Sequence, residues 1–307
     1  MQEFKMYQKT YLVFFLIFFT FYCQNQQRVQ QRSIRTFKAS PYIYKFSHNQ
    51  IFLKVYVKSS NSYKEPEARW ALLDSGSTVN LMLDNELERK IWDLAFEKES
   101  TSFSPMEFHN LGTALPKDYD LVLGAPFFQR HCLIFEYGVP VSIQQNLKKK
   151  CFSQEGIDNK EIPNLISLEL IPKNGLVHAS VQIGTKEELM AIDTGSGMSS
   201  LPLSEFNESM QSLNQNILVM DIQGKKRLRK LYVVSKPIQL KQLHFSPAKI
   251  LDSDEVWDGK EGYSSTLGVD FLKTFRVYID FGSKILGIDH NEYKQGQNHS
   301  SNEWGSR

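Results

Sequence analysis

The chain has 307 residues, of which 41% are hydrophobic, and its 36 Lys and Arg residues against 34 Asp and Glu give a formal net charge of +2. This length allows two domains of ordinary size, and the hydrophobic content argues against global disorder. A charge so close to zero gives no reason to expect a nucleic-acid partner or binding to an acidic membrane surface.

The first 23 residues have the pattern of an export signal. Lys5 and Lys9 precede an apolar run from Tyr11 to Tyr22 that only Thr20 interrupts, and this run is shorter than the roughly 20 residues needed to span a bilayer. A buried core helix fits poorly, because the segment is aromatic on every side and then turns abruptly polar. We expect residues 1–23 to direct export, leaving the protein secreted, periplasmic or anchored to a membrane by its N-terminus, with residues 24–40 as a polar tether.

The chain has three cysteines. Cys23 closes the apolar run, where a bacterial lipoprotein carries its lipid, but bulky residues precede it where small ones are usual, so lipid attachment at Cys23 stays open. Cys132 and Cys151 could pair in an oxidising compartment or could remain free thiols. There is no CxxC motif and no Cys/His cluster, so we expect no metal site and no cofactor.

Residues 41–145 are predicted to form a first lobe of mainly strand character. "IFLKVYVKSS" (51–60) alternates apolar and polar residues, and "EARWALLD" (67–74) is a second strand ending on Asp74. "DNELERKIWDLAFEK" (84–98) predicts a helix, with Asp84 as N-cap and apolar residues on one face. "YDLVLGAPFF" (119–128) and "HCLIFEYG" (131–138) predict strands again.

A polar linker at 146–164 precedes a predicted second lobe at 165–290. Strands are expected at 165–172, 176–184 and 188–193, the last ending on Asp193, followed by a short helix capped by Ser204. Residues 217–234 predict a hairpin turning at Gly224. The polar end, 291–307, is expected to be disordered.

The two halves contain a repeat. "LGAPFFQRHCLIFEYG" (123–138) aligns without a gap on "LGVDFLKTFRVYIDFG" (267–282), and "LLDSGST" (72–78) corresponds to "AIDTGSG" (191–197). An Asp at a strand end is usually a turn residue or a cap, but a duplicated Asp inside the same framework favours another reading. A pseudo-twofold axis would bring Asp74 and Asp193 together.

Two adjacent carboxylates have a specific chemical use. Both cannot ionise cheaply, so the pair holds one proton, and the two pKa values belong to the pair jointly. The ionised partner can take a proton from a water molecule while the protonated partner hydrogen-bonds the carbonyl under attack. Asp74 and Asp193 are therefore the candidate catalytic residues, and the chemistry they predict is amide hydrolysis.

The residues beside each aspartate are predicted to support the pair. Gly76 and Gly195 allow a tight turn that aims N–H groups at the carboxylates. Ser75 and Thr194 could place hydroxyls across the axis, and the hydroxyls of Ser77 and Ser196 could donate to the outer carboxylate oxygens. Ordinary turn hydrogen bonding is the alternative for each hydroxyl.

These paired motifs, with "LVLGAPFF" and "STLGVDFL", resemble the pepsin/retropepsin-like aspartic proteases over residues 45–145 and 165–289. The resemblance implies an all-β, two-lobed barrel fold with pseudo-twofold symmetry, one short helix per lobe and one catalytic Asp from each lobe. It implies structural roles for Gly124 and Gly268, a polypeptide substrate, an aspartic endopeptidase activity and a monomer. The alternative is a non-catalytic exported lipoprotein that binds peptides or proteins in the same cleft, while unrelated β-domains would leave the repeat unexplained.

The flap that covers the cleft in this family is harder to place. The first lobe has little room for one, and "SFSPMEFHNLGTALP" (102–116) shows no clear hairpin. "MDIQGKKRLRK" (220–230) in the second lobe is the candidate, although its basic residues, Lys225, Lys226, Arg227 and Arg229, are more typical of a solvated face. Residues 24–40 are too short for a typical inhibitory pro-segment.

Overall fold

The computed structural model describes residues 36–38, 42–47, 49–59, 65–82, 89–97, 104–110, 119–136, 138–145, 165–220, 226–254 and 265–289. These residues belong to one unit, Thr36–Arg307. The predicted export signal, the linker at 146–164, the tail at 291–307, Cys23 and Cys151 all lie outside the described residues. Within the described part of the chain, no helix is long and apolar enough to cross a membrane.

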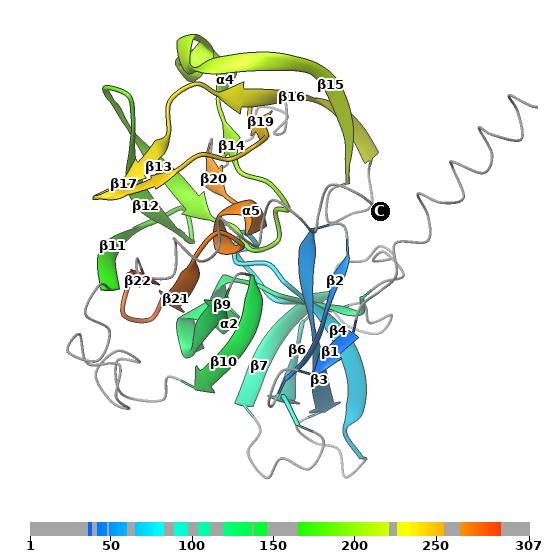
Figure 1. Cartoon of the computed structure of the whole chain (residues 1–307). Helices are drawn as coiled ribbons and strands as arrows, with labels where there is room; N and C mark the ends of the chain where they lie inside the picture. Colours follow the sequence, from blue (N-terminus) through cyan, green and yellow to red (C-terminus); the bar gives the residue numbers. More distant parts are fainter. Residues whose placement is uncertain are drawn as a thin grey trace, which may run out of the picture. The chain divides into compact units, whose positions relative to one another are not determined.

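Strands dominate both halves of the unit (Figure 1). The strands of the first half are β1 (Thr36–Lys38), β2 (Ile43–Ser47), β3 (Gln50–Ser59), β4 (Glu67–Leu73), β5 (Leu81–Met82), β6 (Arg89–Ala95), β7 (Ser104–Asn110), β8 (Leu121–Leu123), β9 (His131–Glu136) and β10 (Val139–Gln145).

The strands of the second half are β11 (Leu165–Lys173), β12 (Leu176–Ile183), β13 (Lys186–Ile192), β14 (Ser200–Leu201), β15 (Met210–Met220), β16 (Lys226–Val234), β17 (Ile238–Leu240), β18 (Leu243–Phe245), β19 (Ile250–Asp252), β20 (Thr266–Leu267), β21 (Arg276–Asp280) and β22 (Ile285–Asp289). The helices are short: α2 (Ala125–Arg130), α4 (Leu203–Phe206), the 3₁₀ turn Asn207–Ser209 and α5 (Val269–Leu272).

The first lobe is a closed six-stranded barrel. Its strands follow the order β3-β4-β8-β5-β7-β6, and β6 returns to pair with β3. β3 shows why the sequence forms it: Leu53, Val55 and Val57 are at most 1% exposed and face the core, while the alternating Lys54 and Tyr56 are half-buried. The predicted alternation in this strand is confirmed.

The second lobe repeats the same pairing pattern. β4 pairs in parallel with β8, β5 pairs antiparallel with β8, and β5 pairs in parallel with β7. In the same order, β13 pairs with β20, β14 with β20 and β14 with β19. The predicted fold class, an all-β two-lobed barrel fold with pseudo-twofold symmetry, is confirmed.

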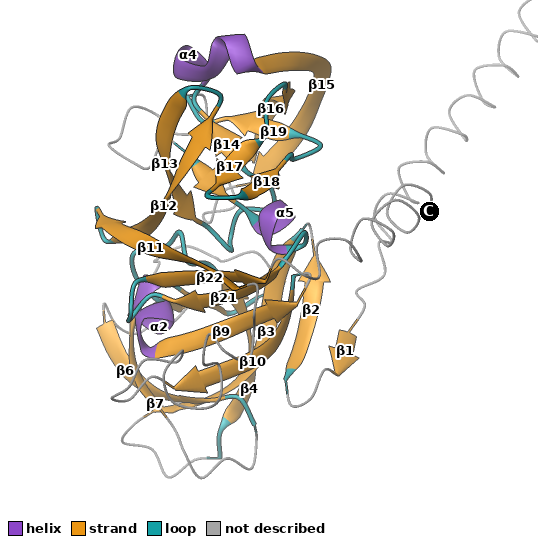
Figure 2. Cartoon of the chain, turned by 60° about the vertical axis from the view of Figure 1, so that its left-hand side comes forward, coloured by secondary structure: helices purple, strands orange, loops and turns teal. Residues whose placement is uncertain are grey.

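Strands from both halves join between the lobes. β9 of the first half pairs antiparallel with β21 of the second, within the order β10-β9-β21-β22-β11. Figure 2 shows these strands running side by side, with helices only in short segments. One hydrophobic core continues through both halves, so the relative position of the two motif-bearing loops is fixed by packing as well as by hydrogen bonds.

The helix predicted at 84–98 is wrong: its central part is strand β6. Leu94 and Ala95 pair with Val57 and Tyr56 of β3, and the other edge of β6 pairs with β7. Helix propensity differs by less than about 0.7 kcal/mol per residue among ordinary residues. Closing the barrel gives β6 two hydrogen-bonded neighbours and buries Leu94 and Ala95 to 2% exposure or less, and this outweighs the local preference.

Three further differences concern local elements. The strand expected at 119–128 contains only β8 and then turns into α2, whose helical conformation begins after Gly124. The short helix predicted to be capped by Ser204 is α4, but Ser204 lies inside it: the helix begins at Leu203, Pro202 is at the N-cap position, and no side chain caps it. The first lobe does contain a hairpin, β6–β7, where the sequence suggested none.

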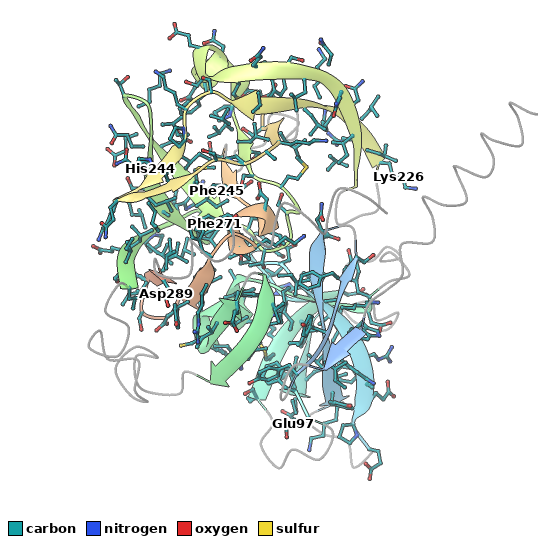
Figure 3. The ribbon with its side chains drawn as sticks, viewed as in Figure 1. Glu97, Lys226, His244, Phe245, Phe271 and Asp289 are labelled. Atoms are coloured by element: carbon teal, nitrogen blue, oxygen red, sulfur yellow. The ribbon has the colours of Figure 1, made fainter. Side chains whose placement is uncertain are left out.

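The hairpin predicted in the second lobe is present as β15–β16. Its turn, including Gly224 and Lys225, lies outside the described residues. β16 joins the rest of the sheet through Leu231 and Tyr232, which pair with β19. The pairs from Asn216–Lys230 to Met220–Lys226 therefore extend beyond this junction, and Lys226 marks their far end in Figure 3.

Candidate functional site

The two motif aspartates occupy equivalent positions immediately after equivalent strands. Asp74 follows β4 and its N–H donates to the carbonyl of Leu123 at 3.0 Å, while Asp193 follows β13 and donates to Leu267 at 3.0 Å. In each lobe this bond ties the aspartate to the strand that ends in the Leu-Gly pair. The start of each loop is therefore set by the sheet.

The two carboxyl groups lie against each other's loop. A Cβ atom built on Gly76 would lie 2.6 Å from Cγ of Asp193, and one built on Gly195 would lie 2.4 Å from Cγ of Asp74. Real Cβ atoms do not approach another atom so closely. Each glycine is thus required by the close approach of the opposite carboxyl group, and the structure brings Asp74 and Asp193 together.

Ser75 and Thr194 form a reciprocal set of hydrogen bonds between the loops. The N–H of Ser75 donates to Oγ1 of Thr194 and the N–H of Thr194 donates to Oγ of Ser75, both at 3.0 Å. The hydroxyl of Ser75 then donates to the carbonyl of Ile192 at 2.6 Å, and that of Thr194 donates to Leu73 at 2.9 Å. Both side chains are buried, so these bonds hold the loops in one arrangement.

Backbone N–H groups point at both carboxylates. Gly76 donates to Oδ1 of Asp74 at 3.1 Å, whereas Oδ1 of Asp193 accepts from both Gly195 at 2.9 Å and Ser196 at 3.0 Å. Such donors stabilise the ionised form of a carboxyl group. The second loop therefore presents two donors to its aspartate.

Burial holds the pKa of the Asp74 carboxyl well above its ordinary value, and the negative charge of Asp193 and a hydrogen bond with Asp193 raise it further. The N–H groups of Gly76 and Ser77 act in the opposite direction but are the smaller influence. Asp193 is 6% exposed. Two acidic groups in this contact favour a state that shares one proton.

The hydroxyls of Ser77 and Ser196 do not donate to the carboxylates, contrary to the sequence prediction. Ser77 donates to the carbonyl of Val79 at 2.7 Å, and Ser196 donates to that of Met198 at 2.6 Å. A hydroxyl has one proton, and here it closes the turn after each loop, as Ser commonly does. Ser196 still contributes to the site through its N–H.

The two predicted structural glycines lie where a backbone crosses behind each loop. A Cβ on Gly124 would lie 2.2 Å from the carbonyl oxygen of Val79, and one on Gly268 would lie 2.6 Å from the carbonyl carbon of Met198. No larger residue fits at either position without displacing the loop backbone. The next residues bind the loops as well, since Ala125 and Val269 donate to the carbonyls of Ser77 and Ser196.

The sequence analysis did not identify three side chains that hold Gly124 and Gly268 behind the two loops. Asn80 accepts the N–H of Gly124 at 2.9 Å, and Ser199 accepts that of Gly268 at 3.1 Å. Ser199 in turn donates to Asp270 at 2.8 Å. Asn80 and Ser199 each follow their aspartate by the same interval, so extending the alignment of the two halves by a few residues would have matched them.

The turn of each lobe's first hairpin contacts the loop of the other lobe. Gln50, at the turn between β2 and β3, donates from Nε2 to the carbonyl of Gly195 at 2.8 Å. Gly175, at the turn between β11 and β12, lies against Thr78. Asn49 and Asn174 both have positive φ at these turns, a conformation that Asn adopts more readily than most residues. Gln50 is a further side chain that the sequence did not identify.

Cys132 on β9 is disulfide-bonded and buried. Its partner cysteine lies outside the described residues. The free-thiol alternative for Cys132 is thereby excluded. Among the described residues there is no group of three or more His, Cys, Asp or Glu side chains that could hold a metal ion.

Comparison with models of protein families gave no match, and comparison with curated proteins found no similar sequence. Among solved structures, the chain is similar to an aspartic proteinase from Irpex lacteus, with 10% sequence identity and a TM-score of 0.45. The match covers 78% of this chain and 94% of the Irpex lacteus protein.

Proposed function

We propose that the protein is an aspartic-type endopeptidase that hydrolyses peptide bonds with a water molecule activated between Asp74 and Asp193. The observation that carries the proposal is the mutual contact of the two carboxyl groups, each lying against the glycine of the other loop. A turn or cap aspartate has no need of this contact, which costs free energy because two acids repel when ionised. The arrangement has a use where a proton must be shared and moved.

The division of roles follows from the surroundings of the two groups. Asp74 has a raised pKa and acts as the proton donor, while Asp193, whose Oδ1 accepts the N–H groups of Gly195 and Ser196, acts as the ionised base. Asp193 takes a proton from the water as the water oxygen attacks the carbonyl carbon of the substrate. Asp74 gives its proton to the carbonyl oxygen, forming a tetrahedral diol.

Collapse of the diol completes the reaction. One hydroxyl returns its proton to Asp74 as the carbonyl reforms, and Asp193 passes its proton to the departing amine nitrogen when the carbon–nitrogen bond breaks. The pair ends with one proton on Asp74, as it began. The rigid cross-bonds between Ser75 and Thr194 keep the two carboxyl groups aligned throughout, which is the contribution expected of a preorganised site.

The proposal is tested with purified protein on a peptide library, with mass spectrometry identifying cleaved bonds between pH 3 and 8. We expect cleavage that a pepstatin-like transition-state mimic blocks, and that Asp74→Asn and Asp193→Asn each abolish. Asp120→Asn is the matched control, because Asp120 lies just before β8, accepts the N–H of Trp70 and pairs with Arg69. Full activity in either dyad variant overturns the proposal, whereas peptide binding without turnover in the wild type favours the binding-module alternative.

The site is complete within one chain, since both aspartates and both cross-bonding hydroxyls belong to it, and we therefore include a monomeric enzyme in the proposal. Light scattering at concentrations where the enzyme is active tests this. The monomer would be contradicted if the specific activity rose with protein concentration in parallel with the formation of a dimer.

Export also belongs to the proposal. The disulfide at Cys132 supports it, because disulfides persist mainly in oxidising compartments. Intact mass spectrometry of the mature protein, with and without reduction, identifies the processed N-terminus and any lipid on Cys23. An unprocessed N-terminus in the natural host contradicts export by cleavage at this signal.

A further inference from the structure

The two lobes hold the glycines of their Leu-Gly pairs, Gly124 and Gly268, in different ways. In the first lobe one side chain is enough, because Asn80 accepts the N–H of Gly124 on its Oδ1 and donates from Nδ2 to the carbonyl of Glu107 at 3.1 Å. In the second lobe the equivalent residue is Ser199, which is shorter and accepts the N–H of Gly268 on a hydroxyl oxygen that is free to rotate. A second group must therefore fix the direction of that hydroxyl.

Asp270 is that second group. Its Oδ1 accepts the hydroxyl of Ser199 at 2.8 Å and the N–H of Phe271 at 3.0 Å. With its proton directed at Asp270, the Ser199 hydroxyl has only lone pairs to offer to Gly268. The first lobe has Pro126 at the equivalent position, so it has no counterpart of this carboxyl group.

The surroundings of Asp270 keep it in place. Phe271, the next residue on α5, packs edge-to-face on Phe245 with ring centroids 5.4 Å apart, and in a tilted arrangement on Phe275 with centroids 5.3 Å apart. Figure 3 shows Phe245 and Phe271 close together in the second lobe. Oδ2 of Asp270 is buried and has no hydrogen-bond partner among the described residues, which leaves its negative charge only partly compensated.

We propose that Asp270 is a positioning residue, which orients the Ser199 hydroxyl so that the second catalytic loop and Asp193 are held in their reactive position. This proposal rests on the proposed peptidase function. It makes the second loop depend on a titratable group, while the first loop depends on the neutral Asn80. The two halves of an otherwise symmetric site therefore respond differently to pH.

The direction of the pH response follows from the hydrogen bonds. Burial raises the pKa of Asp270 to about 6, against the smaller effects of its N–H and hydroxyl donors. Above this pH the ionised carboxylate can only accept, so the Ser199 hydroxyl must donate to it in a strong charge-assisted bond. Below this pH Asp270 can donate to Ser199 instead, and the Ser199–Gly268 bond weakens.

Lys273 follows α5 and reaches the first lobe, and the charge of Asp270 raises its pKa. Its ammonium donates to Oδ1 of Asn49 at 3.2 Å and lies 5.6 Å from the ring of Phe46. Burial lowers the pKa of Lys273, and Asp270 opposes that effect. A Lys273→Met variant therefore shows how much of the Asp270 titration comes from this cation.

The test compares three variants: Asp270→Asn, Asp270→Ala, and a double variant that combines Ser199→Asn and Asp270→Ala. The double variant gives the second lobe an Asn in place of Ser199, as Asn80 serves in the first lobe. We expect Asp270→Ala to lower kcat by about tenfold to 100-fold with little change in KM, since a small misplacement of a reacting group costs this much. The double variant is expected to recover most of kcat. Ser235→Ala, which removes an exposed hydroxyl bonded to Ser209, is the matched control and should leave kcat unchanged.

A second readout does not require activity. Amide hydrogen exchange by NMR should show the protection of Gly268 rising as pH passes upward through about 6, with Gly124 as the internal reference that shows no such step. Asp270→Asn should abolish the step. If the wild type is inactive but the step is present, the peptidase proposal fails while the positioning of Gly268 stands.

The proposal is overturned by a kcat in Asp270→Ala equal to that of the Ser235→Ala control. It is also overturned if the folded double variant stays as slow as Asp270→Ala, or if the step at Gly268 persists in Asp270→Asn. Each variant is first compared with the wild type by circular dichroism and thermal unfolding. Asp270→Asn, the most conservative change, keeps the exchange test available if Asp270→Ala does not fold.

Discussion

Ser75 and Thr194 each accept the other's backbone N–H on a side-chain hydroxyl, at 3.0 Å in both directions. The residues come from different halves of the chain, and each hydroxyl also donates to the strand beneath the opposite aspartate. Four buried hydrogen bonds therefore join the two loops directly. The alignment of Asp74 with Asp193 depends on this ring of bonds as well as on the sheet.

Removing either hydroxyl should destabilise the protein and reduce activity more than stability alone explains. Thr194→Val and Ser75→Ala each leave a buried N–H and a buried carbonyl without partners, at a cost of about 1–3 kcal/mol. Urea unfolding measures this cost, and the double variant should be less destabilised than the sum of the two single variants, because the bonds are shared. Thr194→Ser keeps the hydroxyl and is the control; strict additivity would contradict a shared ring.

Adding a methyl group to either motif glycine should abolish cleavage while leaving the fold largely intact. In Gly76→Ala and Gly195→Ala the new Cβ overlaps the carboxyl group of the opposite loop and forces the dyad apart. The exposed Gly282, between β21 and β22, provides the control variant Gly282→Ala. Peptide cleavage and thermal unfolding are measured together, and wild-type turnover in Gly195→Ala would mean that the two carboxyl groups do not act as a pair.

Activity should end on the alkaline side with the loss of the Asp74 proton. The pKa of Asp74 is raised well above its ordinary value by burial and by Asp193, so the proton-donating form persists to a pH at which an exposed carboxyl group has long been ionised. A profile of kcat/KM against pH should therefore rise from an acid limb, pass a maximum and fall as Asp74 ionises. A strictly alkaline optimum would be incompatible with this assignment.

His131 should make the fold sensitive to acid. Burial lowers its pKa from the ordinary 6.5 to about 4, with the carbonyl of Phe127 opposing and Arg130 reinforcing the shift. The unfolded chain therefore takes up a proton at higher pH than the folded protein, and stability falls as pH drops from 6.5 to about 4, by about 3 kcal/mol in total.

The variant His131→Phe keeps an aromatic ring at this position. In the native protein the His131 ring stacks on that of Phe127, with ring centroids 4.4 Å apart. Its unfolding free energy should change less than that of the wild type between pH 7 and 4. His244→Gln is the control for loss of a histidine, because the His244 side chain is exposed (Figure 3). Equal acid sensitivity in wild type and His131→Phe would assign the effect to other groups.

The pairing of elements decided most of what the sequence could not predict. Residues 84–98 carry a helical spacing of apolar residues, but β6 forms there because β3 and β7 present two open edges to it. The hydroxyls of Ser77 and Ser196 face carbonyl groups two residues later in their own turns. Their direction depends on turn conformation, which residue type alone does not specify.

The candidate site also contains some residues that the sequence could identify and others that it could not. The aspartates, the motif glycines and the Leu-Gly glycines were identifiable because a duplicated pattern in the chain marks positions that serve the same purpose twice. Asn80, Ser199 and Asp270 differ in residue type from their counterparts in the other half, so the repeated letters did not mark them. They hold Gly124 and Gly268, directly or through Ser199, by hydrogen bonds that exist only in the folded protein.

The sequence by itself determined that the chain is duplicated and that an aspartate ends an equivalent strand in each half, because alternation and repetition are properties of the linear order. Tertiary structure decided that the two carboxyl groups meet, that backbone N–H groups and not Ser hydroxyls serve them, and that one loop is held by a neutral amide and the other by an acid. Hydrogen bonds between residues far apart in the chain set these features. Their geometry depends on how both lobes pack around the shared strands, which no local pattern encodes.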